Sequence, residues 1–469
     1  MSDNEIIELT ATQIAAAVRA KRLRAVDVVQ AFIARTERLE PLLNTYAHFM
    51  PEQAMADAQA VDACIARGDD PGPLAGVPVS VKDLIAVGGV PQAFGSRLFA
   101  SNIAGHDAPS VARLRAAGAC ITGKTTTSEL GSKGVGDSPL TGITRNPWNT
   151  GFTPGGSSAG AAAGVAAGLV PVALGTDGGG SIRIPAAFCG LTGFKAQYGR
   201  VPVWPASATP GLAHVAPLAR NVADAALLLS LMAGPDERDA TSAQGEASDF
   251  LSTLSQAFTP LRVGWCPDFG EGGAEPDVLA ACEAAVERLR GAGCTVVMVP
   301  PWLKTGARSP WETEFYAGIA QRIASLPDAL AQIDPALRRQ VEGLQWPVDA
   351  ALLARQRAAI RAELDAVFSE VDVLLSPTLP VAGIPAGQDA PQAWADRGPV
   401  AWSHFTYVFN LTGNPAASAP VGCNAQGLPI GLQVVGRPGD ECTVLRVLQR
   451  LESNGPDFSV AAIDRMRAD

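Results

Sequence analysis

Hydrophobic residues recur along the chain with two different periods. In residues 1–65 they return every three or four positions, as Val28 and Phe32 do, and this spacing predicts helices. Residues 74–87 are instead almost continuously apolar, the pattern of a strand that is covered on both faces. Within that strand Ser80 and Lys82 share one face, because strand side chains alternate with a period of two. The chain therefore combines helices with strands that lie inside the molecule.

The alternation of strands and helices continues to the end of the chain. Short apolar runs predict strands at residues 119–122, 170–174, 261–266, 295–299, 371–375 and 430–435. Helical spacing and helix-capping residues predict helices at residues 109–118, 158–168, 222–233, 276–291, 311–332, 350–370 and about 440–452. Strands that alternate with helices indicate an α/β fold with a mixed or mostly parallel sheet.

Composition narrows the class of protein. Hydrophobic residues make up 47% of the 469 residues and charged residues 17%, with a net charge of −10, so we expect a folded chain rather than a disordered one. The acidic balance, without basic blocks, predicts no nucleic-acid partner. The uncharged run at residues 157–176 is mostly Gly and Ala and contains Pro171, so we expect no membrane span there.

The eight cysteines are scattered, and no pair has the C-x-x-C spacing of a zinc or redox site. We interpret them as small buried hydrophobic residues in a reducing compartment. The start of the chain is acidic, unlike a secretory signal. These observations predict a cytoplasmic protein without a metal ion or another cofactor.

Glycine fills ten of the thirty positions in residues 151–180. One interpretation is a pair of tight turns around a small-residue helix. A phosphate-binding loop is disfavoured, because no Gly-Lys-Ser/Thr follows the first glycine cluster. A nucleophile elbow stays open, since Gly156-Ser-Ser-Ala-Gly160 matches G-x-S-x-G with Ser158 at its centre. That site would need His214 or His404 as a base, and each of these also fits a structural role.

Lys82 offers a different base. It is one of only six lysines, and it stands in the apolar strand, so it has to be paired, neutral or turned toward water. Burial lowers the pKa of a lysine, which is what a general base near neutral pH requires. The alternative is an ion pair with a carboxylate such as the neighbouring Asp83, and the residues alone leave both interpretations open.

Three ordered motifs resemble the amidase signature family: Gly76-Val-Pro-Val-Ser-Val-Lys-Asp83, Pro154-Gly-Gly-Ser-Ser-Ala-Gly160 and Gly175-Thr-Asp-Gly-Gly-Gly-Ser-Ile-Arg-Ile-Pro-Ala186. The resemblance covers the chain from about residue 70 to residue 450. It implies a central twisted mixed β-sheet covered by helices on both faces. We expect a single domain over residues 1–469, with N-terminal helices to residue 65, a catalytic core at about 70–235 and a helical insertion at about 300–370, which would shape the substrate pocket.

The resemblance also implies a role for each matched position. Ser181 would be the nucleophile, Ser157 a relay serine that follows a cis peptide, and Lys82 the neutral base. The backbone N–H groups of Gly178, Gly179, Gly180 and Ser181 would form an oxyanion hole, which Asp177 and Arg183 would orient, and the backbone at Gly131 would touch the substrate. A hydroxyl needs such a base within hydrogen-bond reach, and a glycine run can turn several amides toward one point.

Two residues depart from the family pattern. Ala159 stands where glycine is usual, and Gly178 where Thr or Ile is commoner, which would loosen the oxyanion loop. Neither change removes a catalytic group. The resemblance therefore implies an amidase that cleaves a small-molecule amide to an acid and ammonia or an amine through an acyl-enzyme.

Other functions stay open. The alternative enzyme is the glutaminase component of a tRNA-dependent amidotransferase, its A subunit, although Gly211-Leu-Ala-His-Val-Ala-Pro217 is more similar to stand-alone amidases. A non-catalytic binding protein is disfavoured, because Lys82, Ser157 and Ser181 are all retained. Family members are often homodimers, but no residue here indicates one. The substrate is not identified, because Trp204, Trp311, Phe315 and Trp346 could line a pocket or belong to the core.

Overall fold

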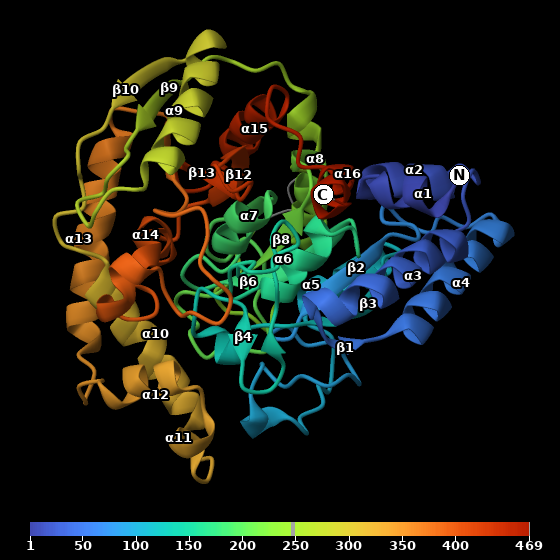
Figure 1. Cartoon of the computed structure of the whole chain (residues 1–469), viewed down its shortest axis with the longest axis horizontal. Helices are drawn as coiled ribbons and strands as arrows, with labels where there is room; N and C mark the ends of the chain where they lie inside the picture. The colour runs from blue at the N-terminus through green and yellow to red at the C-terminus, as the bar shows by residue number, and fades with distance from the viewer. Residues whose placement is uncertain (245–248, 469) are drawn as a thin grey trace.

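The protein is built on one large mixed sheet flanked by helices, as expected (Figure 1). The computed structural model describes residues 1–244 and 249–468. In these residues eleven strands form the sheet in the order β1-β3-β2-β6-β8-β7-β12-β13-β11-β9-β10, and β4 and β5 form a separate pair. The strands are β1 Tyr46–Phe49, β2 Pro78–Lys82, β3 Cys120–Thr125, β4 Asp137–Ser138, β5 Gly142–Ile143, β6 Val172–Asp177, β7 Thr192–Lys195, β8 His214–Ala219, β9 Arg262–Trp265, β10 Thr295–Met298, β11 Val373–Pro377, β12 Ala416–Cys423 and β13 Pro429–Gly436.

Strand direction changes across the sheet. The triplet β3-β2-β6 is parallel, and so is β11-β9-β10 near the other edge. Between them β8, β7, β12 and β13 pair antiparallel with their neighbours. The sheet is therefore mixed, and β2 lies between two parallel partners that bury both of its edges.

Sixteen α-helices accompany the strands in the described residues. They are α1 Asp3–Glu8, α2 Ala11–Arg19, α3 Ala25–Leu43, α4 Pro51–Arg67, α5 Pro109–Ala116, α6 Ala159–Ala166, α7 Arg183–Cys189, α8 Val222–Met232, α9 Pro276–Gly291, α10 Arg308–Ile323, α11 Ala329–Gln332, α12 Pro335–Glu342, α13 Ala350–Phe368, α14 His404–Thr412, α15 Glu441–Glu452 and α16 Val460–Ala468. Short 3-10 turns occur at Arg97–Phe99, Glu129–Gly131, Ser252–Ser255, Gln392–Arg397 and Ala401–Ser403. In the residues that the structure describes, no helix combines the length and the apolar character needed to cross a membrane.

The expected helices of residues 1–65 are interrupted by a strand. Tyr46–Phe49 forms β1, which pairs antiparallel with β3 at the edge of the sheet. Four residues are too few for a two-residue hydrophobic period to stand out between α3 and α4. The pairing with β3 decides the conformation of this segment.

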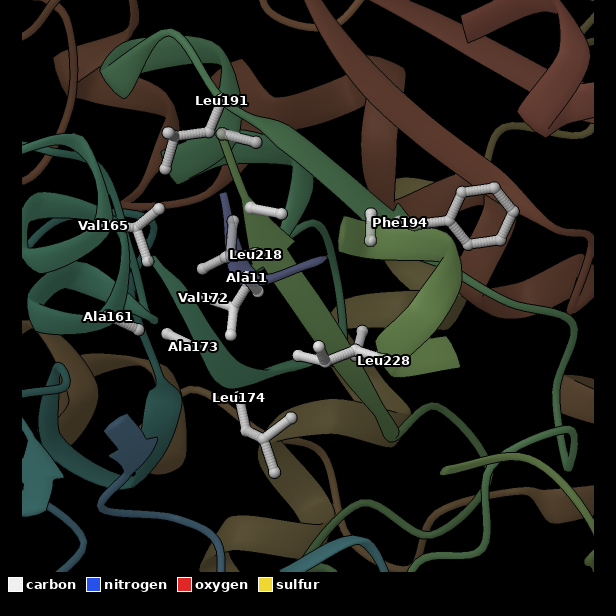
Figure 2. Close-up of a cluster of buried hydrophobic side chains, with 14 of the residues drawn as sticks. Ala11, Ala161, Val165, Val172, Ala173, Leu174, Leu191, Phe194, Leu218 and Leu228 are labelled. Atoms are coloured by element: carbon white, nitrogen blue, oxygen red, sulfur yellow. The ribbon is translucent and has the colours of Figure 1, made fainter. Parts of the chain in front are cut away.

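Small residues let α6 approach the sheet closely. This helix consists of Ala, Gly and one Val, and all its residues are buried. Its side chains Ala161 and Val165 gather with Val172 of β6 and Leu218 of β8 in the main hydrophobic core (Figure 2). A helix without bulky side chains brings the backbone of the segment before it near the strands. That segment carries Ser157 of the predicted site and Ser158, the centre of the possible nucleophile elbow.

Helices α10 to α13 occupy the predicted insertion and form a second hydrophobic core with α14. The helix expected at residues 311–332 is two helices, because α10 ends at Ile323 and α11 begins at Ala329. Pro327 lies in the break and cannot supply a backbone N–H to a continuing helix. The second core places α10 beside the loop that follows β6.

Candidate active site

Three residues far apart in the sequence meet at the end of β2 and β6. Lys82 Nζ lies 2.7 Å from Ser157 Oγ, and Ser157 Oγ lies 2.9 Å from Ser181 Oγ. Lys82 is the last residue of β2, Ser157 precedes α6, and Ser181 lies in the turn between β6 and α7. The structure thus places the three predicted catalytic side chains in one continuous line of hydrogen-bond contacts.

The environment of Lys82 disfavours the charged form of its amine. The side chain is fully buried, and its second polar contact is Thr176 Oγ1 at 2.8 Å. Burial lowers the pKa of Lys82 well below its ordinary value, and the nearby charge of Asp177 only partly opposes this shift. A neutral amine next to a hydroxyl can accept a proton from it. Sequence reasoning missed Thr176, although it lies inside a quoted motif.

Asp83 does not pair with Lys82. Its carboxylate lies 3.5 Å from Lys124 Nζ and accepts the backbone N–H of Gly95. Adjacent residues of an extended segment point to opposite sides, so the two side chains diverge. The ion pair that the sequence left open as an alternative is therefore not formed.

The loop that carries Ser157 packs closely against neighbouring segments of backbone. The Gly156–Ser157 peptide is cis, as the resemblance implied. A Cβ at Gly156 would lie 2.3 Å from the carbonyl oxygen of Val135, so no larger residue fits there. Gly131 also faces this loop, since a Cβ on it would lie 3.2 Å from Ser157 Oγ. These close approaches help to hold Ser157 Oγ between Lys82 Nζ and Ser181 Oγ.

The glycine loop, residues 178–180, is held in place by hydrogen bonds from α10 and α14. Trp311 Nε1 of α10 donates to the carbonyl oxygen of Gly178 at 2.8 Å, and Thr406 Oγ1 of α14 donates to that of Gly179 at 2.7 Å. Gly180 has φ of 128°, a region that residues with a Cβ rarely adopt. The carbonyl groups of this loop are therefore tied to its supporting helices.

The Gly180 amide is already engaged. Its N–H donates to Asp177 Oδ1 at 2.7 Å. A backbone N–H carries a single proton, so this amide is not free to bind an oxyanion in the present conformation. The amides of Gly178, Gly179 and Ser181 stay candidates for that role.

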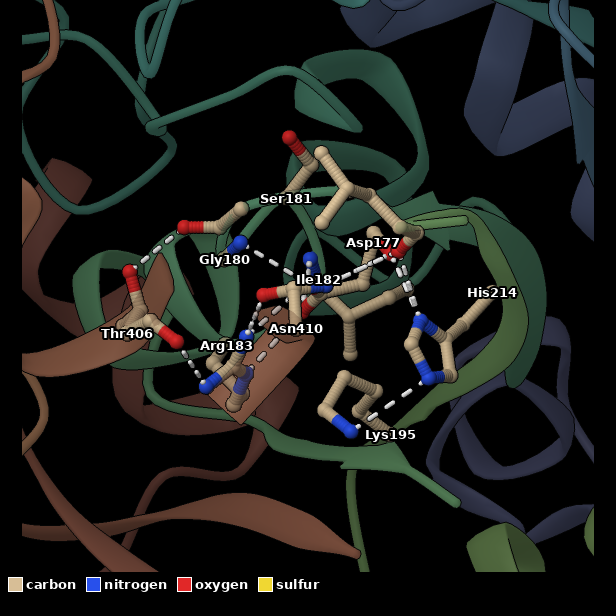
Figure 3. A network of polar contacts seen from close by, with 12 residues as sticks. Asp177, Gly180, Ser181, Ile182, Arg183, Lys195, His214, Thr406 and Asn410 are labelled. Atoms are coloured by element: carbon tan, nitrogen blue, oxygen red, sulfur yellow. Dashed lines mark hydrogen bonds and ion pairs between the residues drawn. The ribbon is translucent and has the colours of Figure 1, made fainter. Parts of the chain in front are cut away.

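Asp177 and Arg183 form a fully buried ion pair beneath the loop (Figure 3). Arg183 donates through Nε and Nη2 to the two carboxylate oxygens at 3.0 and 2.9 Å, and it also reaches Asn410 and Gln433. Burial by itself would raise the pKa of Asp177, but the charge and hydrogen bonds of Arg183, together with the nearby charge of Lys195, outweigh it and hold that pKa well below its ordinary value. The charged pair links the loop to α14 and β13. The sequence predicted the roles of Asp177 and Arg183 but not these contacts with α14 and β13.

Histidines take no part in this line of contacts. The ring of His214 lies behind the loop, with Nδ1 2.9 Å from the carbonyl oxygen of Leu212, and burial lowers its pKa to about 3 (Figure 3). His404 Nε2 lies 3.0 Å from the carbonyl oxygen of Gly272. Ser158 Oγ is turned to the backbone of Thr176, 3.2 Å from its carbonyl oxygen. The geometry of a nucleophile elbow centred on Ser158 is therefore not present in this structure.

A pocket of about 310 Å³ lies above Ser181 and Ser157. Its wall is mainly apolar and includes Leu84, Trp204 and Phe315. Among the described residues that line the pocket, none is Asp or Glu. The arrangement can therefore hold an uncharged or anionic molecule against the two hydroxyl groups.

The four aromatic candidates have different places. Trp204 and Phe315 line the pocket, whereas Trp311 stacks on Phe315 from behind. Trp346 is 51% exposed and belongs neither to the pocket wall nor to the core. Two of the four rings thus line the pocket, one is buried behind it, and one lies on the surface.

Comparisons with known proteins agree with this geometry. A family model described as Amidase matches residues 27–445. The chain is 36% identical to an acylamidase of Rhodococcus erythropolis, with 97% of each protein covered. It is 37% identical to the A subunit of the glutamyl-tRNA(Gln) amidotransferase of Chloroflexus aggregans, covering 94% of this chain and 96% of that protein. A solved bacterial aryl acylamidase of the amidase signature family superposes with a TM-score of 0.90 at 28% identity, covering 98% of each chain.

Proposed function

The chain belongs to the amidase signature family, and on that premise we propose that it is a stand-alone amidase, which hydrolyses a carboxylic amide to an acid and ammonia or an amine. The observation that carries the proposal is the line of contacts Lys82–Ser157–Ser181 at the base of an apolar pocket. Cleavage of an amide requires an activated nucleophile, and a serine becomes one when a base accepts its proton.

Acylation begins with attack by Ser181 Oγ on the amide carbonyl carbon. Ser181 gives its proton to Ser157, and Ser157 gives its own proton to the neutral amine of Lys82. The tetrahedral intermediate then loses its C–N bond, and the relay returns a proton from Lys82 through Ser157 to the departing nitrogen. The products of this half-reaction are free ammonia or an amine and an ester of Ser181.

Deacylation uses the same relay in reverse. A water molecule adds to the ester carbonyl while Ser157 and Lys82 accept its proton. The bond between the acyl carbon and Ser181 Oγ then breaks, Ser181 recovers a proton, and the acid leaves. We assign stabilisation of the oxyanion in both steps to the amides of Gly178, Gly179 and Ser181, and each such donor typically contributes about 3 kcal/mol.

The charge of the pocket supports a stand-alone amidase over the alternative function, the glutamine-using component of an amidotransferase. Free glutamine carries an ammonium group next to its carboxylate, and a protein site usually meets such a cation with a carboxylate. The lining residues provide none. An amide without a positive charge fits this wall better.

Labelling tests the catalytic serine. A fluorophosphonate should modify Ser181, the most accessible hydroxyl of the relay, and peptide mass spectrometry locates the adduct. Ser181→Ala should abolish labelling. Modification at Ser158 instead would contradict the assignment and return the nucleophile elbow to consideration.

Turnover by the purified chain tests the reaction. Incubated alone with aliphatic, aromatic and peptide amides, it should release ammonia or an amine from at least one of these classes. Release from glutamine only in the presence of tRNA and further protein components would favour the amidotransferase instead. Cytoplasmic location and the lack of a cofactor stay predictions from the sequence, and a homodimer stays an expectation that only the family resemblance carries.

A further inference from the structure

An arginine lies in the wall of the pocket. Arg322 lines the pocket and comes from α10, as Phe315 does. Its guanidinium carbon lies 4.9 Å from the ring centroid of Phe94 and 5.9 Å from that of Phe99. Cation–π contacts with two aromatic rings help to hold a guanidinium group in place without using its N–H donors, which stay available to a ligand.

Arg322 has no acidic partner among the described residues. No carboxylate of residues 1–244 or 249–466 lies within ion-pair distance of its guanidinium. Partial burial lowers the pKa of Arg322, and no acidic group opposes that shift. Arg308 on the same helix is paired with Glu312, and Arg357 of α13 with Glu314. Arg322 is therefore a cation that the fold positions but does not neutralise.

Helix α10 fixes the distance between this cation and the reaction centre. Phe315 lies against the glycine loop, since a Cβ on Gly178 would be 3.2 Å from its ring. Arg322 follows Phe315 by seven residues, which is two helical turns, so it lies on the same face roughly 10 Å further along the axis. The pocket wall between the two ends includes apolar residues such as Leu84 and Trp204.

Phe94, one of the two rings in contact with Arg322, is also hydrogen-bonded to the segment that lines the pocket next to Ser157. Phe94 has φ of 54°, which is uncommon for a residue with a bulky side chain. Its carbonyl oxygen accepts the backbone N–H of Leu130 at 2.8 Å, and Leu130 and Gly131 line the pocket next to Ser157. The position of the cation relative to the serines is therefore set by hydrogen-bonded backbone as well as by α10.

We propose that Arg322 determines specificity by binding a carboxylate at the end of the substrate remote from the scissile amide. The inference rests on the proposed amidase function. The substrate would have an apolar body that spans the wall between Ser181 and Arg322 and a terminal carboxylate that meets the guanidinium edge in a bidentate pair. The carboxylate belongs either to the acyl half or to the amine half of the amide.

Matched substrates test the inference and separate the two sources of carboxylate. One series consists of monoamides of linear dicarboxylic acids from succinate to sebacate, each paired with its methyl ester. The other consists of N-acetyl derivatives of linear ω-amino acids, each paired with its methyl ester. The wild type should prefer the carboxylate member of one series, most strongly at an intermediate length, and the preference should weaken as salt is added.

Substitution of Arg322 should remove the preference. In Arg322→Gln the ratio of kcat/KM for carboxylate over ester should fall about tenfold, the size of one charge-assisted hydrogen bond, with the change mainly in KM. Arg322→Lys keeps the charge without the planar group and should retain part of the ratio. The control Arg338→Gln removes an exposed arginine of α12, outside the pocket wall, and should retain the full ratio.

Binding to Ser181→Ala gives a readout that does not depend on turnover. Calorimetry should find the preferred carboxylate amide bound more tightly than its ester, and the difference should vanish in the double variant with Arg322→Gln. Equal binding of acid and ester, or equal losses for both in Arg322→Gln, would overturn the proposal and assign Arg322 a structural role. Carboxylate binding without hydrolysis by the wild type would instead contradict the proposed function alone.

Discussion

Three lysines are buried completely in this molecule, and their neighbours give each a different chemistry. Lys124 lies against the carboxylate of Asp83, and Lys195 donates to the backbone carbonyl groups of Ala196 and Asn414. Lys82 is in contact with two hydroxyl groups. A hydroxyl cannot neutralise an ammonium ion, so burial disfavours the charged form of Lys82 and lowers its pKa.

Lys82→Met should abolish turnover and change the pH dependence of stability. The pKa of Lys82 is lowered in the folded protein from an ordinary value of 10.5, so below that pH the unfolded chain binds a proton that the folded protein resists. The wild type therefore loses stability as the pH falls from about 10 toward the lowered pKa, and the variant does not.

Urea unfolding at several pH values measures this difference. The free energy of unfolding of Lys82→Met minus that of the wild type should increase as the pH decreases. Lys304→Met, at an exposed position, provides the control and should follow the wild type. A difference that is independent of pH, or near-wild-type activity in Lys82→Met, would contradict the assignment of a neutral base.

At the scale of elements, the glycine loop acquires its shape from α10. Trp311 holds the Gly178 carbonyl oxygen, and a Cβ on Gly179 would lie 2.4 Å from the Trp311 ring. A shift of the loop away from α10 would break this hydrogen bond, and no side chain fits between Gly179 and the indole ring. Glycine at these positions therefore serves the close approach of a helix that begins more than a hundred residues later in the sequence.

Gly179→Ala should reduce kcat much more than it reduces stability. The added methyl group has to displace the indole ring or shift the loop, and a misplaced amide donor typically costs on the order of a hundredfold in kcat. Steady-state kinetics and thermal unfolding together measure both effects. Gly273→Ala is the matched control, because nothing lies near its Cβ position. Unchanged kcat in Gly179→Ala would show that the loop tolerates a shift.

Some elements could not be predicted from local pattern. Strands β8 and β12 contain Pro217 and Pro420, and β12 is rich in Ala, so neither shows the β-branched alternation that is typical of strands. Both are nevertheless central in the sheet, because β6 and β7 pair with β8, and β7 and β13 pair with β12. Long-range pairing overrides the weak local preference of these segments.

At the scale of the whole molecule, a buried carboxylate helps to fasten the N-terminal helices to the central part of the chain. Asp224, in the first turn of α8, is buried and accepts the backbone N–H groups of Ala11 and Thr12 at 2.8 and 3.0 Å. These groups begin α2 and have no partner inside the helix. The two ends of the chain also pack together, since Arg35 of α3 pairs with Asp464 of α16.

Asp224→Ala should destabilise the protein by about 1–3 kcal/mol, because it leaves buried N–H groups of α2 without an acceptor. Chemical unfolding measures the loss, and the position is remote from the pocket wall, so kcat should stay close to that of the wild type. Asp27→Ala, which removes an exposed carboxylate, is the control and should change stability by less than about 0.5 kcal/mol. A loss of the same size in both variants would contradict the fastening role.

The sequence by itself determined the α/β class, most of the helices and the identity of Lys82, Ser157 and Ser181 as candidates, because hydrophobic period and ordered motifs are local properties. Tertiary structure decided which candidates meet. In the folded chain Ser158 is hydrogen-bonded to the backbone, and Asp83 pairs with Lys124. The Gly180 amide donates its hydrogen bond to Asp177. Tertiary structure also brought Arg322 to the pocket through a helix packed by the second core. These outcomes depend on contacts between distant segments, which no local pattern specifies.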